Sequence, residues 1–424
     1  MKTVMDMLNG DARVSDYKIN VHKKESYELF FIKGKLETVR CTDTCDKEVT
    51  VYVDHDQWKG EAQFFVYPST TEQQLRARID EAVAKALLIN NRSFMLPADE
   101  TGSYTVESNF ADYDSADLAA VVAGAVFCAN TVEKASLNSV EVFVNKHTET
   151  VCNSRGLQKS QVRYSAMVEA IPTYNGETQS VELYERYNFG SMIEEEILRE
   201  IGGKMEQVKA RCYAVVPETK PNCPVILNKE ELNELFSTIA EDLNYVSVYA
   251  HANLWKKGDA IQKAPSGDVI GICMAGEAPG CTRSAKFDSD GMSLGSIRIV
   301  EAGKAVSYYG SNRFGQYLDE VPTGDLHCVC VDQGTLEAAE FEKGPYLEVV
   351  SMSGLQVDLY SDYIGGEIRL AYYHDGNTVT PVTGISISGA LSDVLDRIRL
   401  SEEVGVHNGY RGPVKALITG MKIF

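Results

Sequence analysis

The chain has 424 residues, of which 44% are hydrophobic and 24% are charged, a balance typical of a globular protein that buries a sizeable core and, at this length, forms two domains. Asp and Glu number 61 against 41 Lys and Arg, a formal net charge of −20, which disfavours direct nucleic-acid binding because phosphate recognition needs clustered positive charge. No apolar run reaches the roughly 18 residues that cross a membrane, and the first residues lack a secretion-signal pattern. We therefore expect a cytoplasmic protein with no membrane partner.

The first half of the chain predicts antiparallel strands backed by helices. Alternating apolar residues indicate strands on both sides of a turn at 33–35 and again within 48–67. Ser69 and Glu72 have the spacing of a capping box, and apolar residues every four positions after them predict a helix.

The same reasoning continues to the middle of the chain. A second helix is predicted over 117–130, and two short strands over 140–144 and 148–152. Ser191 and Glu194 form another capping-box pattern at the start of a long helix.

Three prolines within 216–224 predict a domain boundary. They divide the chain into an N-terminal α+β domain, 1–215, and a mainly β C-terminal domain, 224–424. The second domain opens with a helix capped by Asn228 and Glu231, and it has a further helix near its end, over 391–400. The expected fold class is α+β, with an antiparallel sheet and helices first and a mainly β domain after it.

Several segments, in this order, resemble the TldD/PmbA family. "VCNSRGLQKSQVRYSAMVEA" (151–170) resembles the family's Asn-Ser-x-Gly strand-turn-strand, so the resemblance assigns Asn153, Ser154 and Gly156 to a structural turn. "KFDSDGMSLGSIRIVEAGKAVSYYGSNRFGQYL" resembles its Asp-rich turn, strand and glycine hairpin, and "PVTGISISGALSDVLDRI" is similar to its closing block.

The resemblance implies two branches of the family. One bears zinc on a His-Glu-x-x-x-His helix that opens the second domain, with a cysteine near the C-terminus, and the PmbA/TldE-like branch lacks these ligands. Aligned on that motif, Ser237 replaces the first histidine, Thr238 the glutamate and Asp242 the second histidine, with Glu241 beside it. His407 stands where the cysteine is expected. Serine is a poor zinc ligand and threonine cannot act as a carboxylate base, so we interpret these five positions as a vestigial site with no catalytic residue and no metal.

For function, the resemblance implies a non-catalytic subunit of a peptide-processing or peptide-degrading metalloprotease system. Such a subunit forms part of a channel for unfolded or small peptides, as a homodimer or as a heterodimer with a zinc-bearing TldD-like relative, and zinc enters only through that partner. Two alternatives stay open: an active peptidase with an unrecognised site, and a regulatory binding protein of the kind named in the family's older label, modulator of DNA gyrase.

The ten cysteines are expected to be reduced, because the chain is long and has no secretion-signal pattern. "LHCVC" (326–330) is the sharpest metal-like pattern among them. On a strand, however, Cys328 and Cys330 point to one face and His327 to the other, so the three cannot bind one ion together. Cys273 and Cys281 flank "MAGEAPG", and we expect both thiols to belong to the loop and the core.

Overall fold

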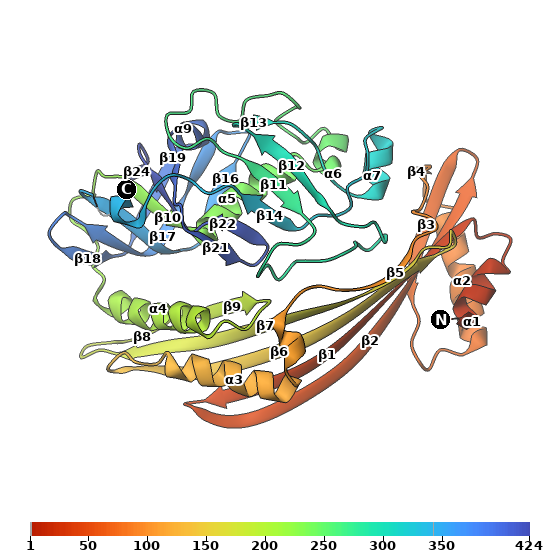
Figure 1. The fold of residues 1–424 in the computed structure, drawn as a ribbon, viewed down its shortest axis with the longest axis horizontal. Helices are drawn as coiled ribbons and strands as arrows, with labels where there is room; N and C mark the ends of the chain where they lie inside the picture. Colours follow the sequence, from red (N-terminus) through yellow and green to blue (C-terminus); the bar gives the residue numbers. More distant parts are fainter. Residues whose placement is uncertain (1, 342) are drawn as a thin grey trace.

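The computed structural model describes residues 2–341 and 343–424. A long curved sheet forms the N-terminal part, and two further sheets form the C-terminal part, which lies over the concave face of the first sheet (Figure 1). The α+β fold class predicted from the sequence is confirmed, whereas the domain limits 1–215 and 224–424 stay a prediction. No helix within the described ranges is long and apolar enough to cross a membrane.

The N-terminal sheet has the strand order β4-β3-β2-β1-β6-β7-β5, with β8 and β9 paired to β7. Its strands are β1 (Asp16–Ile32), β2 (Lys35–His55), β3 (Trp58–Phe65), β4 (Asn91–Arg92), β5 (Thr101–Thr105), β6 (Ala135–Asn153), β7 (Gln158–Asn175), β8 (Ser180–Glu182) and β9 (Glu185–Phe189). Its helices are α1 (Lys2–Asn9), α2 (Glu72–Ala86), the 3₁₀ helix η1 (Asn109–Asp112), α3 (Ser115–Cys128) and α4 (Glu194–Tyr213).

The two faces of this sheet differ in polarity because successive residues of a strand point to opposite sides. On β6, Val140, Val142 and Val144 are buried in one core with apolar residues of α3 and α4. Farther along the same strand, His147 and Glu149 lie on the other face. The concave face is thus polar, and it is the face turned toward the C-terminal sheets.

The C-terminal part holds two sheets. The larger contains β10 (Val225–Asn228), β15 (Tyr346–Met352), β16 (Gln356–Asp358), β17 (Tyr363–His374), β18 (Val379–Val382), β19 (Ile385–Ala390), β20 (Arg399–Leu400), β23 (Lys415–Ile418) and β24 (Lys422–Ile423). The smaller contains β11 (Ile272–Ala275), β12 (Ser296–Glu301), β13 (Lys304–Ala305), β14 (Cys328–Val331), β21 (Val404–His407) and β22 (Tyr410–Pro413). The helices are α5 (Lys229–Asp242), α6 (Tyr245–Tyr249), α7 (Asn312–Tyr317), α8 (Ala338–Phe341) and α9 (Leu391–Arg397).

Helix α5 packs between these two sheets. Leu232, Leu235, Phe236 and Ile239 are fully buried in a core to which both sheets contribute. The Phe236 ring stacks on Tyr410 of the smaller sheet, with centroids 6.3 Å apart. This apolar stripe fixes the rotation of α5 and leaves its polar side outside that core.

Two of the predicted helix caps are wrong. Helix α2 begins two residues later than Ser69 would require: Thr71 is its N-cap, with the Gln74 backbone N–H donating to the Thr71 hydroxyl at 3.2 Å. Helix α4 begins at Glu194 after Ile193, with no side-chain cap, so Ser191 does not cap it. The cap of α5 is confirmed, because the Asn228 backbone N–H donates to Glu231 Oε2 at 3.3 Å.

The two strands predicted over 140–144 and 148–152 are one continuous strand, β6. The polar residues between them do not interrupt it, because β1 and β7 continue the ladder on both sides through Lys146. Backbone pairing on two edges outweighs the weak strand propensity of a polar segment.

A buried lysine of the N-terminal sheet forms hydrogen bonds to turn 286–293, which belongs to the C-terminal part of the fold. The Lys159 side chain on β7 is completely buried, and its Nζ donates to Gly291 O at 2.8 Å and to Ser293 Oγ at 2.7 Å. Nζ also pairs with Glu100 at 2.7 Å. These contacts set the spacing between the concave face and the domain above it.

Candidate functional site

Two adjoining cavities form the candidate site: one lies between the concave face and the C-terminal part, and the other lies within the C-terminal part. The first, which we call the sheet cavity, has a volume of about 530 Å³ and is bounded on one side by β1, β2, β6 and β7. The second, the helix cavity, has a volume of about 380 Å³ and is bounded by the polar side of α5. Arg283, Asp325 and His327 line both, so the two cavities adjoin at these residues.

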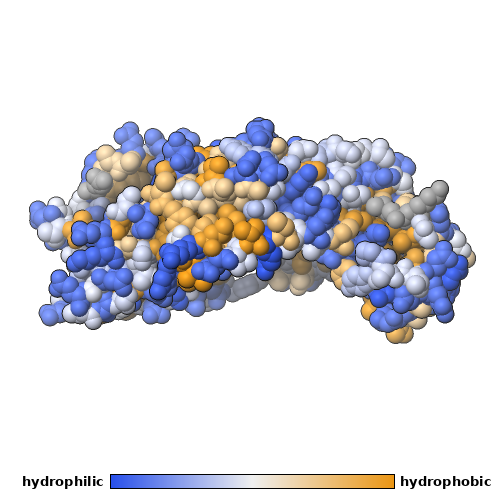
Figure 2. Space-filling model, turned by 90° about the horizontal axis from the view of Figure 1, so that it is seen from below, coloured by the Kyte–Doolittle hydropathy of each residue, from blue (hydrophilic) through white to orange (hydrophobic). Residues whose placement is uncertain are grey.

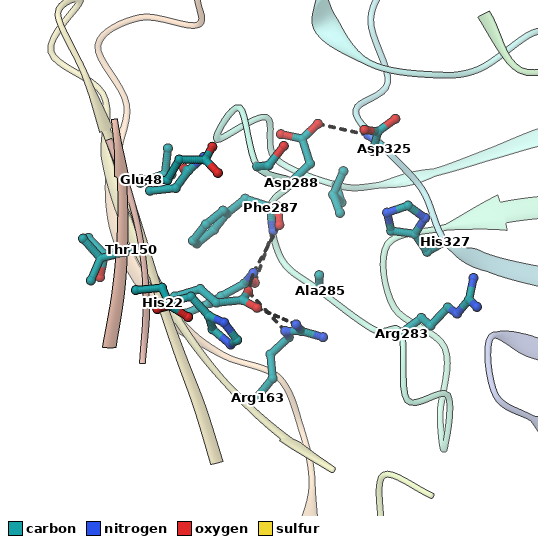
Figure 3. A pocket seen from close by; sticks show the side chains of 18 of the residues that line it. His22, Glu48, Thr150, Arg163, Arg283, Ala285, Phe287, Asp288, Asp325 and His327 are labelled. Atoms are coloured by element: carbon teal, nitrogen blue, oxygen red, sulfur yellow. Dashed lines mark hydrogen bonds and ion pairs between the residues drawn. The ribbon is translucent and has the colours of Figure 1, made fainter. Parts of the chain in front are cut away.

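The wall contributed by the N-terminal sheet is polar and internally paired. Glu149 pairs with Arg163 at 2.5 Å and accepts a hydrogen bond from Gln161 Nε2 at 2.6 Å (Figure 3). Burial alone raises the pKa of Glu149, but these two partners outweigh it and hold the pKa below its usual value. Glu149 is therefore ionised and neutralised within the wall.

Two histidine rings stack on the same wall. The His22 and His147 centroids are 5.3 Å apart with nearly parallel planes, and His22 Nε2 lies 3.1 Å from His147 Nδ1. Burial, with smaller contributions from Arg163 and His22, lowers the pKa of His147 to about 4. The inner ring is thus neutral near pH 7, and His22 is the ring that lines the cavity.

On the opposite wall, Asp288 organises the loop. Its carboxylate accepts the backbone N–H groups of Asp290 and Met292, at 2.9 and 3.0 Å, and that of Asp325 at 3.0 Å. Burial, and next the nearby Asp290, raise the pKa of Asp288 to about 6. Asp288 therefore holds the backbone of Asp325 in place, and the Asp325 side chain lies where the two cavities adjoin.

Asp325, His327 and Arg283 line that junction, with His327 between the other two (Figure 3). Desolvation in the cleft lowers the pKa of His327, although the Asp325 carboxylate opposes this. Desolvation raises the pKa of Asp325. Sequence reasoning set His327 on the face opposite Cys328 but did not assign it to a site, because only the fold brings that face to the cleft.

Of the five positions assigned to the vestigial site, the structure brings two together on the helix cavity. Ser237 and Glu241 line it, with Asn233 and Glu234 of the same helix. The Ser237 hydroxyl donates to Asn233 Oδ1 at 3.3 Å. This polar edge of α5 is the only helical contribution to the cavity from the described part of the chain.

The other three positions lie outside the cavity lining. Thr238 donates to the Glu234 carbonyl at 2.9 Å, and the buried Asp242 accepts the backbone N–H groups of Leu254 and Trp255 at 2.6 and 3.0 Å. Asp242 thus anchors the chain that follows α6.

His407 is not among the residues that line either cavity. Its Nε2 accepts a hydrogen bond from Asn408 Nδ2 at 3.0 Å, and Asn408 is the residue that lines the helix cavity. Burial is the main cause that lowers the pKa of His407.

Zinc does not fit this donor set. The α5 edge offers a hydroxyl and carboxylates but no imidazole or thiolate, and Asp242 is committed to backbone groups. Within residues 2–341 and 343–424, no group of three or more His, Cys, Asp or Glu side chains is arranged to hold a metal ion.

The remaining sequence candidates pack into the structure. Cys328 is fully buried in a small cluster with Cys281, against which Cys330 packs, and none of the ten cysteines, all of which lie in the described ranges, forms a disulfide. Asn153, Ser154 and Gly156 join β6 to β7: Asn153 Oδ1 accepts the Arg155 N–H at 2.9 Å, and Gly156 has φ +81°.

We expect Glu231→Gln to stabilise the chain above pH 7. Burial, and next the charge of Glu230, raise the pKa of Glu231 from 4.5 to about 7, so the folded chain binds a proton that the unfolded chain has released. Stability contributed by this group therefore falls as pH rises from about 4.5 to 7. Glutamine supplies an amide oxygen in place of the carboxylate oxygen that caps α5, and it removes the charge.

Urea unfolding at pH 5 and pH 8 measures this effect. The variant should gain on the order of 2 kcal/mol over the wild type on going from pH 5 to pH 8, since one pKa unit is worth about 1.4 kcal/mol. An equal stability difference at both pH values would contradict the raised pKa of Glu231.

This architecture is similar to that of several solved structures, and part of the chain matches a known family. Residues 220–423 match the family model described as PmbA/TldA metallopeptidase C-terminal domain, and no curated protein sequence matches the chain. TldE from Thermococcus kodakarensis shares the fold with a TM-score of 0.80 and 16% identity, over 99% of each chain. A proposed modulator of DNA gyrase from Bacteroides thetaiotaomicron has a TM-score of 0.79 and 13% identity, over 100% of this chain and 97% of its own. Another from Thermotoga maritima has a TM-score of 0.76 and 16% identity over 100% of both. Residues 220–423 of the chain therefore form a PmbA/TldA metallopeptidase C-terminal domain, and the whole chain shares the fold of these solved structures.

Proposed function

We propose that this chain binds extended peptides in the joined sheet and helix cavities, and that it acts as the non-catalytic, TldE-like subunit of a peptide-processing system. The observation that carries the proposal is that the two cavities adjoin at Arg283, Asp325 and His327, and that the helix cavity runs along the polar edge of α5, the first helix of the metallopeptidase-family domain. A concave space that holds both apolar surface and a few polar groups is the usual form of a ligand site.

The shape and chemistry of the cavities suit an extended chain. Phe287 and Leu294 give the sheet cavity apolar surface, and Asn20 adds an amide group that can pair with a peptide backbone. The turn fastened by Lys159 keeps the two walls at a fixed separation, so the site is largely formed before a peptide enters.

A second subunit completes the proposed system. The α5 edge lacks the zinc ligands of the family's other branch, so cleavage would depend on a zinc-bearing, TldD-like partner. Exposed apolar residues lie on α3 and on the β1–β2 hairpin beside it: Ile32, Leu36, Val39 and Val121, each 42–53% exposed. Figure 2 shows apolar side chains gathered on this lower face, a surface that supports association with a homologous or identical subunit.

The test uses a fluorescent, unstructured peptide. Fluorescence anisotropy should report binding to the chain alone, and Thr282→Trp, which fills the sheet cavity, should weaken it by about tenfold or more, the loss expected when a bulky side chain blocks a contact region. Thr131→Trp, on an exposed loop after α3, is the matched control and should bind as the wild type does.

Cleavage is measured in the same samples. The chain alone should leave the peptide intact, and adding a zinc-bearing relative should give cleavage that a chelator stops. Absence of binding to the chain alone would reject the proposed site, whereas chelator-sensitive cleavage by the chain alone would show an active peptidase.

A further inference from the structure

We propose that the joined cavities select peptides that carry lysine or arginine. The inference rests on the proposed function, because it concerns the ligand of the same site. It derives from the balance of charges on the cavity walls and from which of those charges already have partners.

The cavity walls are far more acidic than the chain as a whole. The two cavities together are lined by seven Asp and Glu residues and two Arg residues, with no lysine. The whole chain has 61 acidic residues against 41 basic ones. The ratio at the walls is therefore a local property rather than a consequence of the net charge.

Most of these acids lack a partner. Glu149 is neutralised by Arg163, and the Asp288 carboxylate is satisfied by backbone N–H groups. The other five form no ion pair with any residue that the structure describes: Asp46, Glu48, Glu234, Glu241 and Asp325. Arg283 is the lining cation that likewise forms no ion pair within the described ranges.

The unpaired acids are distributed along the whole space. Asp46 and Glu48 are two apart on β2 and so share the face that lines the sheet cavity. Glu234 and Glu241 are seven apart on α5, about two turns, and so share the edge that lines the helix cavity. Asp325 lies between the pairs, so a peptide that spans both cavities meets a carboxylate in each part.

Unpaired carboxylates on opposing walls of a cleft reinforce one another's field, since the protein around them screens poorly and focuses the potential. A cationic side chain relieves their mutual repulsion. Arginine does so with a planar set of donors that matches a carboxylate, and lysine does so as a point charge. Arg283 has the opposite effect, because it repels a cation at the junction and offers a partner to a peptide carboxylate or carbonyl.

Three labelled peptides of equal length test the inference, identical except for four alternate positions occupied by Lys, Gln or Glu. We expect the Lys peptide to bind about tenfold more tightly than the Gln peptide at low salt, and the Glu peptide most weakly. The differences in affinity among the three peptides should become smaller at an ionic strength near 0.5 M, where the screening length is about 4–5 Å. Equal affinities for the three peptides would overturn the inference and leave the proposed function standing, whereas failure of all three to bind would reject the proposed function itself.

Charge variants locate the effect. Glu234→Gln with Glu241→Gln should weaken the Lys peptide several-fold and leave the Gln peptide unchanged. Arg283→Gln should strengthen binding of the Lys peptide. The matched control is Glu194→Gln with Glu195→Gln, which alters the net charge equally but lies on the exposed first turn of α4. An equal loss in this control would show that net charge, and not the cavity, governs binding.

Discussion

Replacing Lys159 with alanine is expected to cost about 1–3 kcal/mol of stability, the range for leaving a buried polar group without its partner, because Glu100 is 46% exposed and solvent screens that ion pair. The Lys159 side chain is completely buried and serves three acceptors: Glu100, Gly291 O and Ser293 Oγ. Alanine leaves the Gly291 carbonyl without this donor in a buried position, and an unsatisfied buried polar group carries its full desolvation cost. The midpoint of urea unfolding measures the loss.

Lys85→Ala is the matched control. Lys85 pairs with Glu81 at 2.7 Å, the same separation as Lys159 and Glu100, but both side chains are more than 60% exposed. The control should change the midpoint little, because solvent screens the pair and the freed groups are hydrated. Similar losses in both variants would mean that burial is not what makes the Lys159 contacts strong.

Lys159→Ala should also weaken peptide binding. The turn that Lys159 holds includes Asp288, whose carboxylate accepts the Asp325 N–H at the cavity junction. A variant that is destabilised but binds peptide with wild-type affinity would show that the turn keeps its place through its other contacts with the N-terminal sheet.

The sequence predicts those parts of the fold that depend on local patterns. The Asn228 and Glu231 cap of α5 is confirmed. The capping-box spacing in the sequence there coincides with the observed start of the helix. Ser69 does not cap α2, because Thr71, two residues later, takes that role. The spacing of residues in the sequence does not show which of the two caps the helix. Residues 140–152 form one strand because β1 and β7 pair with it, which is a tertiary effect.

The site was less accessible from sequence for the same reason. The walls of the two cavities come from β1, β2, β6, β7, α5 and loops separated by more than 200 residues. The alternation in "LHCVC" places His327 and Cys328 on opposite faces of a strand. The neighbouring sequence does not show that the face with His327 meets a cavity bounded by a second sheet. Likewise, the alignment of Asp242 with a zinc ligand could not reveal that its carboxylate holds two backbone N–H groups.

Those two hydrogen bonds govern the outcome of restoring the zinc motif. Ser237→His, Thr238→Glu and Asp242→His together place the family's three side-chain types on α5. The first two changes alter residues that bond within their own helix. The third removes the acceptor of the Leu254 and Trp255 N–H groups, and each donor left unsatisfied costs about 1–3 kcal/mol.

We therefore expect the triple variant to be less stable than the double variant Ser237→His with Thr238→Glu by about 2–4 kcal/mol, the sum of two such losses reduced by hydration. It should also fail to cleave an unstructured peptide. Residues five apart on a regular helix point about 140° from each other, so side chains at 237 and 242 do not converge on one ion. Unfolding measurements, metal analysis and the fluorescent cleavage assay on both variants test this. A triple variant as stable as the double one, with one zinc per chain and chelator-sensitive cleavage, would show that α5 retains a working metalloprotease geometry.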